Sequence, residues 1–276
     1  MITVDSFSHE EVLGIKLGYH PFAKPSMFVH TYFIDGLLID TAQRLTRKKL
    51  LASTNDLPIE QIYVTHHHED HSGNIGVLID RHKCPVYASN LCCEMMKDPP
   101  HITFAQKITW GNRPAQKDLI PKEGIIETRN YSFEIIPIPG HAPDMVALYE
   151  PNRKWLFSAD LYINSYISYM LDDESISTQI DSTKRIMELD FDVLFCAHKP
   201  KLEKGKQQLE KKLNFLESFY ETVANLYQKG NRAEEIFNQL NLKEDYFVKA
   251  LSGGYLSKMN MVKSVIRDFQ DELKNG

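Results

Sequence analysis

The sequence predicts an α/β fold built in layers, because short apolar strands alternate with helices along much of the chain. Residues 61–64 and 85–88 are apolar runs of strand length, and residues 73–82 between them have the length and composition of a helix. A chain of 276 residues is long enough for one large α/β domain, or for one domain with an appendage.

The first third of the chain reads as β-structure. Residues 28–34 and 37–40 flank Asp35-Gly36, a pair typical of a two-residue type I′ turn, so they predict a hairpin. Residues 46–52 then predict a short basic helix with Thr46 as its N-cap.

The middle of the chain alternates irregular and regular stretches. Prolines and a Trp-Gly pair interrupt any period over residues 98–123, which is typical of a lid or a pocket wall. Two hairpins are expected beyond it, one from residues 125–128 and 133–138, the other from residues 145–149 and 155–158.

The C-terminal part of the chain is predicted to be helical. Apolar residues recur near helical spacing over residues 206–228, and residues 233–240 and 258–269 predict two more helices, with Ser257 able to cap the last. We therefore divide the chain into an α/β domain over residues 1–201 and a helical extension over residues 202–276. The extension is expected to wall a pocket or to build a homodimer.

Composition and charge exclude several classes of protein. The net charge of -5 and the pI near 6.1 argue against a surface that coats nucleic acid. No apolar run approaches the roughly 20 residues that cross a bilayer, so no membrane partner is expected. The N-terminus lacks the pattern of a secretory signal, and the four cysteines show no disulfide framework, which predicts a cytoplasmic protein.

The run Thr65-His66-His67-His68-Glu69-Asp70-His71 is the strongest functional signal of the chain. Imidazole suits zinc and related transition metals, and a nearby carboxylate adds an oxygen ligand. If the chain leaves a strand here, His66, His68 and Asp70 alternate along one side and His71 opens the next helix. This spacing predicts metal binding, with one turn serving two neighbouring metal positions.

Three later strand-like runs also end at a residue type that binds metals. The run before Pro139-Gly140 leads to His141, the run before Ala159 leads to Asp160, and the run before Cys196-Ala197 leads to His198. Together with the first cluster, these residues resemble the metal-binding set of the metallo-β-lactamase-fold hydrolases, particularly uncharacterised bacterial-type members rather than true β-lactamases. Leu38-Ile39-Asp40-Thr41 and Ser72-Gly73-Asn74 add to the resemblance, which covers roughly residues 1–200.

The resemblance implies a four-layer αββα sandwich with the C-terminal helical extension added to it. It implies two divalent metal ions, expected to be zinc with manganese or iron as alternatives. Their expected ligands are His66, His68 and His141 for one ion, Asp70, His71 and His198 for the other, and Asp160 as the bridge. It implies a metal-bridging hydroxide as nucleophile, because metal ligation lowers the pKa of water to about 7. Asp70 is expected to orient this hydroxide as a catalytic residue.

Other residues receive supporting roles. His67 and Glu69 alternate with the expected ligands and should point to the opposite side, for support or toward solvent. Asp40 either hydrogen-bonds a ligand histidine or is a simple turn carboxylate. Tyr162 lies two residues beyond Asp160, and in lactonase relatives a tyrosine near the metals contacts the substrate, so Tyr162 is a second candidate catalytic residue.

These observations predict a dinuclear metal-dependent hydrolase of a small-molecule ester, thioester or lactone. Two alternatives stay open, a mononuclear iron persulfide dioxygenase of the same fold and a non-catalytic metal-binding scaffold. By resemblance, the iron of the dioxygenase would sit on His66, His141 and Asp160. Glyoxalase II enzymes carry a second histidine shortly after the counterpart of His141, and residues 140–145 supply none. This departure weakens, without excluding, a glutathione-thioester hydrolase.

Overall fold

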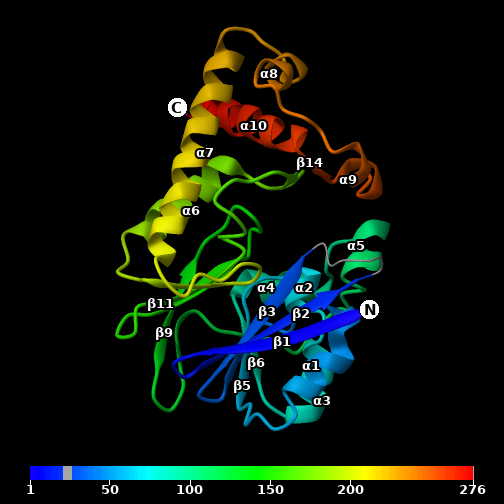
Figure 1. The fold of residues 1–276 in the computed structure, drawn as a ribbon, viewed down its shortest axis with the longest axis vertical. Coiled ribbons are helices and arrows are strands. Elements are labelled where there is room, and N and C mark those ends of the chain that lie inside the picture. Colours follow the sequence, from blue (N-terminus) through cyan, green and yellow to red (C-terminus); the bar gives the residue numbers. More distant parts are fainter. Residues whose placement is uncertain (21–26, 276) are drawn as a thin grey trace.

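The computed structural model describes residues 1–20 and 27–275, which form two β-sheets packed face to face and covered by helices on both outer sides (Figure 1). The first sheet has seven strands that follow one another in chain order. They are β1 (Ile2–His9), β2 (Val12–Tyr19), β3 (Phe28–Ile34), β4 (Leu37–Ile39), β5 (Gln61–Val64), β6 (Val86–Ala88) and β7 (Ile120–Pro121). Strands β1 to β4 pair antiparallel, whereas β4 to β7 pair parallel.

The second sheet has five strands in the order β13-β11-β10-β9-β8. They are β8 (Gly124–Glu127), β9 (Ser132–Pro137), β10 (Val146–Glu150), β11 (Trp155–Ala159) and β13 (Val193–Cys196). Only the β11–β13 pair is parallel. A separate ribbon pairs β12 (Met170–Leu171) with β14 (Leu256–Ser257), so it joins the middle of the chain to its C-terminal part.

The helices fall into two groups along the chain. The first group covers the seven-stranded sheet or extends from it: α1 (Arg47–Ser53), which follows the 3-10 turn Arg44–Thr46, then α2 (Glu69–Ser72), α3 (Ile75–His82), α4 (Asn90–Lys97) and α5 (Phe104–Thr109). The second group stacks at one end of the molecule (Figure 1): α6 (Ile176–Met187), α7 (Gly205–Gln228), α8 (Ala233–Gln239), α9 (Tyr246–Leu251) and α10 (Met259–Asn275). No helix in the described ranges is long and apolar enough to cross a bilayer.

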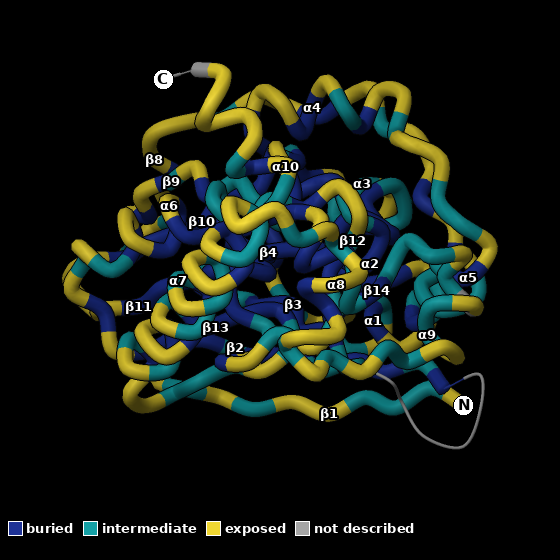
Figure 2. The backbone as a smooth tube through the Cα atoms, turned by 90° about the horizontal axis from the view of Figure 1, so that it is seen from above, coloured by how far each residue is buried: buried dark blue, intermediate teal, exposed yellow. Residues whose placement is uncertain are grey.

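Side-chain alternation along the central strands explains the layers. In β5, Ile62 and Val64 pack toward helices α1, α3 and α4, whereas Tyr63 packs between the two sheets. In β11, Trp155 and Phe157 pack between the sheets, whereas Leu156 packs on the opposite face, with residues of α6 and α7. Successive residues of a strand point to opposite faces, so a strand buried on both sides is apolar throughout. Figure 2 shows the edge strand β1 as intermediate or exposed along its length.

The expected α/β fold with four αββα layers and C-terminal helices is confirmed. The expected hairpin between β3 and β4 is present, and Asp35 and Gly36 have φ angles of 44° and 85°, both positive as a type I′ turn requires. Thr46 occupies the expected N-cap position of α1, but its hydroxyl donates to the carbonyl of Gln43 and makes no capping hydrogen bond.

Candidate metal centre

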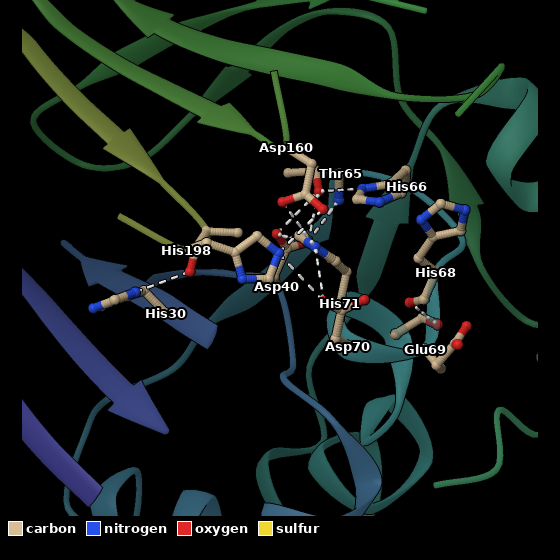
Figure 3. Close-up of polar contacts among 12 residues, drawn as sticks. His30, Asp40, Thr65, His66, His68, Glu69, Asp70, His71, Asp160 and His198 are labelled. Atoms are coloured by element: carbon tan, nitrogen blue, oxygen red, sulfur yellow. Dashed lines mark hydrogen bonds and ion pairs between the residues drawn. The ribbon is translucent and has the colours of Figure 1, made fainter. Parts of the chain in front are cut away.

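Four strands deliver the expected metal ligands to one place, at an edge that the two sheets share. The loop and the short helix α2 after β5 carry the first four ligand candidates, and β9, β11 and β13 each lead to one of the others. In Figure 3 the side chains of His66, His71, Asp160 and His198 are turned toward one another. The structure brings all seven together, as two groups, His66, His68 and His141, and Asp70, His71, Asp160 and His198. Within each group the candidate ligand atoms lie within 4.8 Å of one another.

The local backbone of the first motif differs from the expected one. Strand β5 ends at Val64, so His66 and His68 lie in a loop, and Asp70 belongs with His71 to the one-turn helix α2. His66, His68 and Asp70 therefore do not face the cluster through the side-chain alternation of a continuing strand. A loop followed by a helical turn presents the same four side chains to the cluster.

Asp160 joins the two groups. Its Oδ2 lies 3.3 Å from Nε2 of His141 and 3.3 Å from Nε2 of His198, and its Oδ1 lies 3.4 Å from Nε2 of His71. The ring of His141 also faces that of His68, with 3.0 Å between Nε2 and Nδ1. Asp70 completes the second group, with its Oδ2 3.5 Å from Nε2 of His198. Asp160 thus stands where one carboxylate reaches both groups.

Several atoms of this cluster are buried without a hydrogen-bond partner among the described residues. These are Nε2 of His66, Nε2 of His71 and Oδ1 of Asp160. Leaving such a group unpaired costs about 1–3 kcal/mol. A cation held between imidazole nitrogens and carboxylate oxygens would satisfy all three atoms, and nitrogen with oxygen is the donor set that zinc accepts. The residues present therefore fit divalent metal ions.

The protonation of the imidazoles follows from their surroundings. Burial, together with neighbouring imidazoles, holds the pKa of His66 and of His68 well below its ordinary value, so both rings are neutral, as metal binding requires. Burial also lowers the pKa of His71, but the carboxylates of Asp40 and Asp160 outweigh it and raise that pKa. The carboxylates attract positive charge to the cluster. A metal ion would supply that charge in place of protons.

A second set of residues orients the rings of the cluster. Nδ1 of His71 lies 2.7 Å from Oδ2 of Asp40, which also accepts a hydrogen bond from the hydroxyl of Thr65. Nδ1 of His198 donates to the carbonyl of Phe28 over 2.8 Å. Each contact leaves Nε2 free to face the cluster (Figure 3). Asp40 therefore contacts an expected ligand histidine, the first of its two expected roles. Sequence reasoning missed Thr65, although it directly precedes the histidine run.

His67 and Glu69 point away from the cluster, and both are buried rather than solvated. The backbone N–H of His67 donates to Asp144, and its Nδ1 lies 2.7 Å from the same carboxylate. Glu69 lies 3.5 Å from Arg113, which also donates to the carbonyl of His67. Burial raises the pKa of Glu69 to about 7. These pairs anchor the histidine run to the loop before β10 and to the segment before β7. Sequence reasoning did not identify Asp144 or Arg113 as supports.

Tyr162 does not lie where a substrate-contacting residue is expected. Its ring is only 1% exposed and packs with the core between the second sheet and α7. Its hydroxyl lies 3.1 Å from that of Ser165. The chain bends at Ala159, where φ is 44°, and the residues beyond it turn into the core. The structure therefore packs Tyr162 in the core, and its catalytic role stays a prediction.

A cavity of about 310 Å³ opens beside His68 and His141. The irregular segment over residues 98–123 contributes Pro100, His101 and Arg113 to its lining, so the expected pocket wall is present. Tyr255, in the turn before β14 of the C-terminal extension, also lines it. The lining mixes apolar groups with hydrogen-bonding groups. Both parts of the chain therefore shape the space next to the cluster.

Comparisons with known proteins agree with this geometry. An uncharacterised protein of Aquifex aeolicus is 27% identical over 164 residues, 58% of this chain and 78% of its own length. A hydroxyacylglutathione hydrolase of Bdellovibrio bacteriovorus is 30% identical over 146 residues, 52% of this chain but only 51% of its own length. The match thus spans about half of that enzyme.

Solved structures share the fold over most of the chain. A metallo-β-lactamase family protein of Thermus thermophilus superposes with a TM-score of 0.71 at 17% identity, covering 95% of this chain and 94% of its own. A flavo-diiron protein of Thermotoga maritima gives 0.62 at 16% identity, with 84% and 71% covered. Residues 27–198 match the sequence model of the metallo-β-lactamase superfamily. The chain therefore belongs to the metallo-β-lactamase superfamily.

Proposed function

We propose that this protein is a metal-dependent hydrolase that binds two divalent metal ions and cleaves an ester, thioester or lactone of a small molecule. The observation that carries the proposal is the pair of donor groups joined by Asp160. A site for one metal ion would need only one of these groups. The presence of both donor groups favours a hydrolase over a persulfide dioxygenase, which would need a single iron ion.

The roles of the donor residues follow from their grouping. His66, His68 and His141 would hold one ion, Asp70, His71 and His198 the other, and Asp160 would contact both. We propose zinc as the metal, with manganese or iron as alternatives, since nitrogen and carboxylate donors suit all three. Bound here, two such ions supply an acidified water and a Lewis acid that polarises the scissile carbonyl.

The protein's own side chains supply proton handling and substrate binding. We propose that Asp70 orients the attacking water and accepts its proton, because this carboxylate reaches into the second group from α2. The neighbouring cavity lies at the small end of the range for ligand pockets. It suits a compact acyl group and is partly closed to water by the segment that carries His101 and Arg113.

A thioester is the first substrate class to test, because several relatives are named hydroxyacylglutathione hydrolase. Glutathione itself is not assigned, since residues 140–145 lack the second histidine of those enzymes. The experiment begins with the metal content of the purified protein. Protein reconstituted with zinc or manganese is then assayed against thioesters, lactones, phosphodiesters and β-lactams.

We expect two metal equivalents per chain and hydrolysis of at least one ester, thioester or lactone. His66→Ala and Asp70→Ala should each lower kcat/KM on the order of 10³-fold or more while the protein stays folded. Asp80→Ala is the matched control, since Asp80 is exposed on α3. Full activity in either donor variant would contradict the proposal. One iron per chain with oxygen uptake on glutathione persulfide would assign the protein to the persulfide dioxygenases instead.

A further inference from the structure

We propose that Glu174 is a positioning residue for His141 and that the C-terminal helices hold Glu174 in place for this task. The inference rests on the proposed metal centre. Glu174 lies within the residues 27–198 that match the family, whereas helices α7 and α10, which the inference also gives a role there, lie beyond them. Glu174 lies between β12 and α6, is 7% exposed, and stands 33 residues from His141 in sequence.

The two nitrogens of His141 face opposite partners. Nδ1 lies 3.2 Å from Oε1 of Glu174, whereas Nε2 faces Asp160 and His68 in the cluster. A carboxylate that accepts the Nδ1 proton leaves Nε2 as the lone-pair nitrogen and fixes the rotation of the ring. Glu174 thus relates to His141 as Asp40 relates to His71.

Helix α10 fixes the backbone of Glu174. The carbonyl of Glu174 accepts hydrogen bonds from the hydroxyl of Ser264, over 3.0 Å, and from the guanidinium of Arg267. The same Ser264 hydroxyl accepts from the backbone N–H of Ile176, at the start of α6. The N–H of Ser175 donates to the carbonyl of Gly140, directly before His141. The segment from Glu174 to Ile176 is therefore hydrogen-bonded both to α10 and to the loop that carries His141.

A buried chain of contacts fixes the carboxylate of Glu174. Its Oε2 accepts a 2.6 Å hydrogen bond from the side chain of Gln179 on α6. The amide oxygen of Gln179 accepts in turn from Lys212 on α7, over 3.1 Å. Lys212 is 2% exposed and also donates to the carbonyl of Leu161, the residue after Asp160. Helix α7 therefore reaches loops on both sides of the centre.

The test measures metal affinity rather than activity. Zinc affinity of the full chain is determined by competition with a chromophoric chelator, and ligand geometry is read from the visible spectrum of the cobalt-substituted protein. Glu174→Gln keeps the size of the side chain and removes its charge. We expect it to weaken binding of one of the two metal equivalents by about 10–100-fold and to alter the cobalt spectrum. Ser264→Ala, which touches no ligand residue, should shift both readouts in the same direction but less.

Two exposed residues of α7 give matched controls, Glu210→Gln and Ser218→Ala, which should leave affinity and spectrum unchanged. A purely structural role for Glu174 would lower the unfolding midpoint of the metal-free protein without changing the affinity or the spectrum of the folded protein. That result would overturn the inference. Wild-type protein that binds two equivalents but cleaves no compound of the panel would contradict the proposed function and leave this inference standing.

Discussion

At the scale of single residues, the candidate metal centre is supported by side chains that point away from it. Asp144 is 2% exposed and accepts two hydrogen bonds from His67, one from the backbone N–H and one from Nδ1. These bonds hold the middle of the histidine run, so that its neighbours on either side can turn toward the cluster. A buried donor that loses its acceptor costs about 1–3 kcal/mol.

We expect Asp144→Ala to lower the free energy of unfolding by about 2–4 kcal/mol, because two buried donors lose their acceptor together. Urea unfolding of the metal-free protein measures this effect apart from any change in metal binding. Asp271→Ala is the control, since Asp271 forms only an exposed ion pair with Lys274 and should change the stability by less than about 0.5 kcal/mol. A loss in Asp144→Ala no larger than in the control would refute the supporting role.

The residue types of the centre could be predicted from sequence, whereas most of their supports could not. His66 to His71 form a dense local motif, and His141, Asp160 and His198 each follow a recognisable strand. Glu174 contacts His141 because α6, α7 and α10 pack around the loop that carries Glu174. No local sequence pattern predicts that packing. The burial of Tyr162 could not be predicted for a related reason: nearness to Asp160 in sequence does not say where a side chain points once the backbone bends at Ala159.

At the scale of elements, the one-turn helix α2 is too short to be stable by itself. Two hydrogen bonds from Thr41, one from its N–H and one from its hydroxyl, hold the carbonyl of His71. The side-chain amide of Asn74 donates to the carbonyls of Thr41 and Ala42. These contacts explain why Leu38-Ile39-Asp40-Thr41 and Ser72-Gly73-Asn74 occur together with the histidine run. The three segments form one packed unit.

Gly73 provides a test of this unit. A Cβ atom at this position would lie 2.6 Å from the backbone nitrogen of Arg44 and 2.6 Å from the carbonyl oxygen of Glu69. Backbone atoms cannot rotate aside, so α2 would have to shift. We expect Gly73→Ala to cost about 1–3 kcal/mol of stability and to weaken zinc binding, because Asp70 and His71 move with α2. Urea unfolding and chelator competition measure the two effects.

Gly76→Ala is the matched control for that substitution. The nearest atom to its added Cβ would be the side-chain amide nitrogen of Gln116, at 3.7 Å, an ordinary contact. Because Gly76 lies inside α3, alanine there should be neutral or stabilising by up to about 1 kcal/mol. Equal behaviour of the two variants would show that α2 is not held by close packing at Gly73.

At the scale of the whole molecule, the predicted boundary between residues 201 and 202 divides the sequence, but the segments on its two sides pack into the same apolar core. Leu209 of α7 is fully buried and belongs to the same apolar cluster as Leu194 of β13 and Ile186 of α6. The outer face of the second sheet is therefore covered by a helix from the C-terminal extension. The β12–β14 ribbon and the contacts of Glu174 add to this packing, so we expect the extension to fold together with the rest of the chain.

We predict that the full chain unfolds in a single transition, in which tryptophan fluorescence and far-ultraviolet circular dichroism change together. Trp155 reports on the second sheet, whereas the helices dominate the dichroism. Leu209→Ala should move the whole transition by about 2–5 kcal/mol, because it opens a cavity in the shared cluster. Leu273→Ala on α10, where the side chain is 68% exposed, is the control and should shift it by less than about 0.5 kcal/mol. Two separate transitions, with only one sensitive to Leu209→Ala, would mean that residues 1–201 fold as an independent domain and that α7 only rests on it.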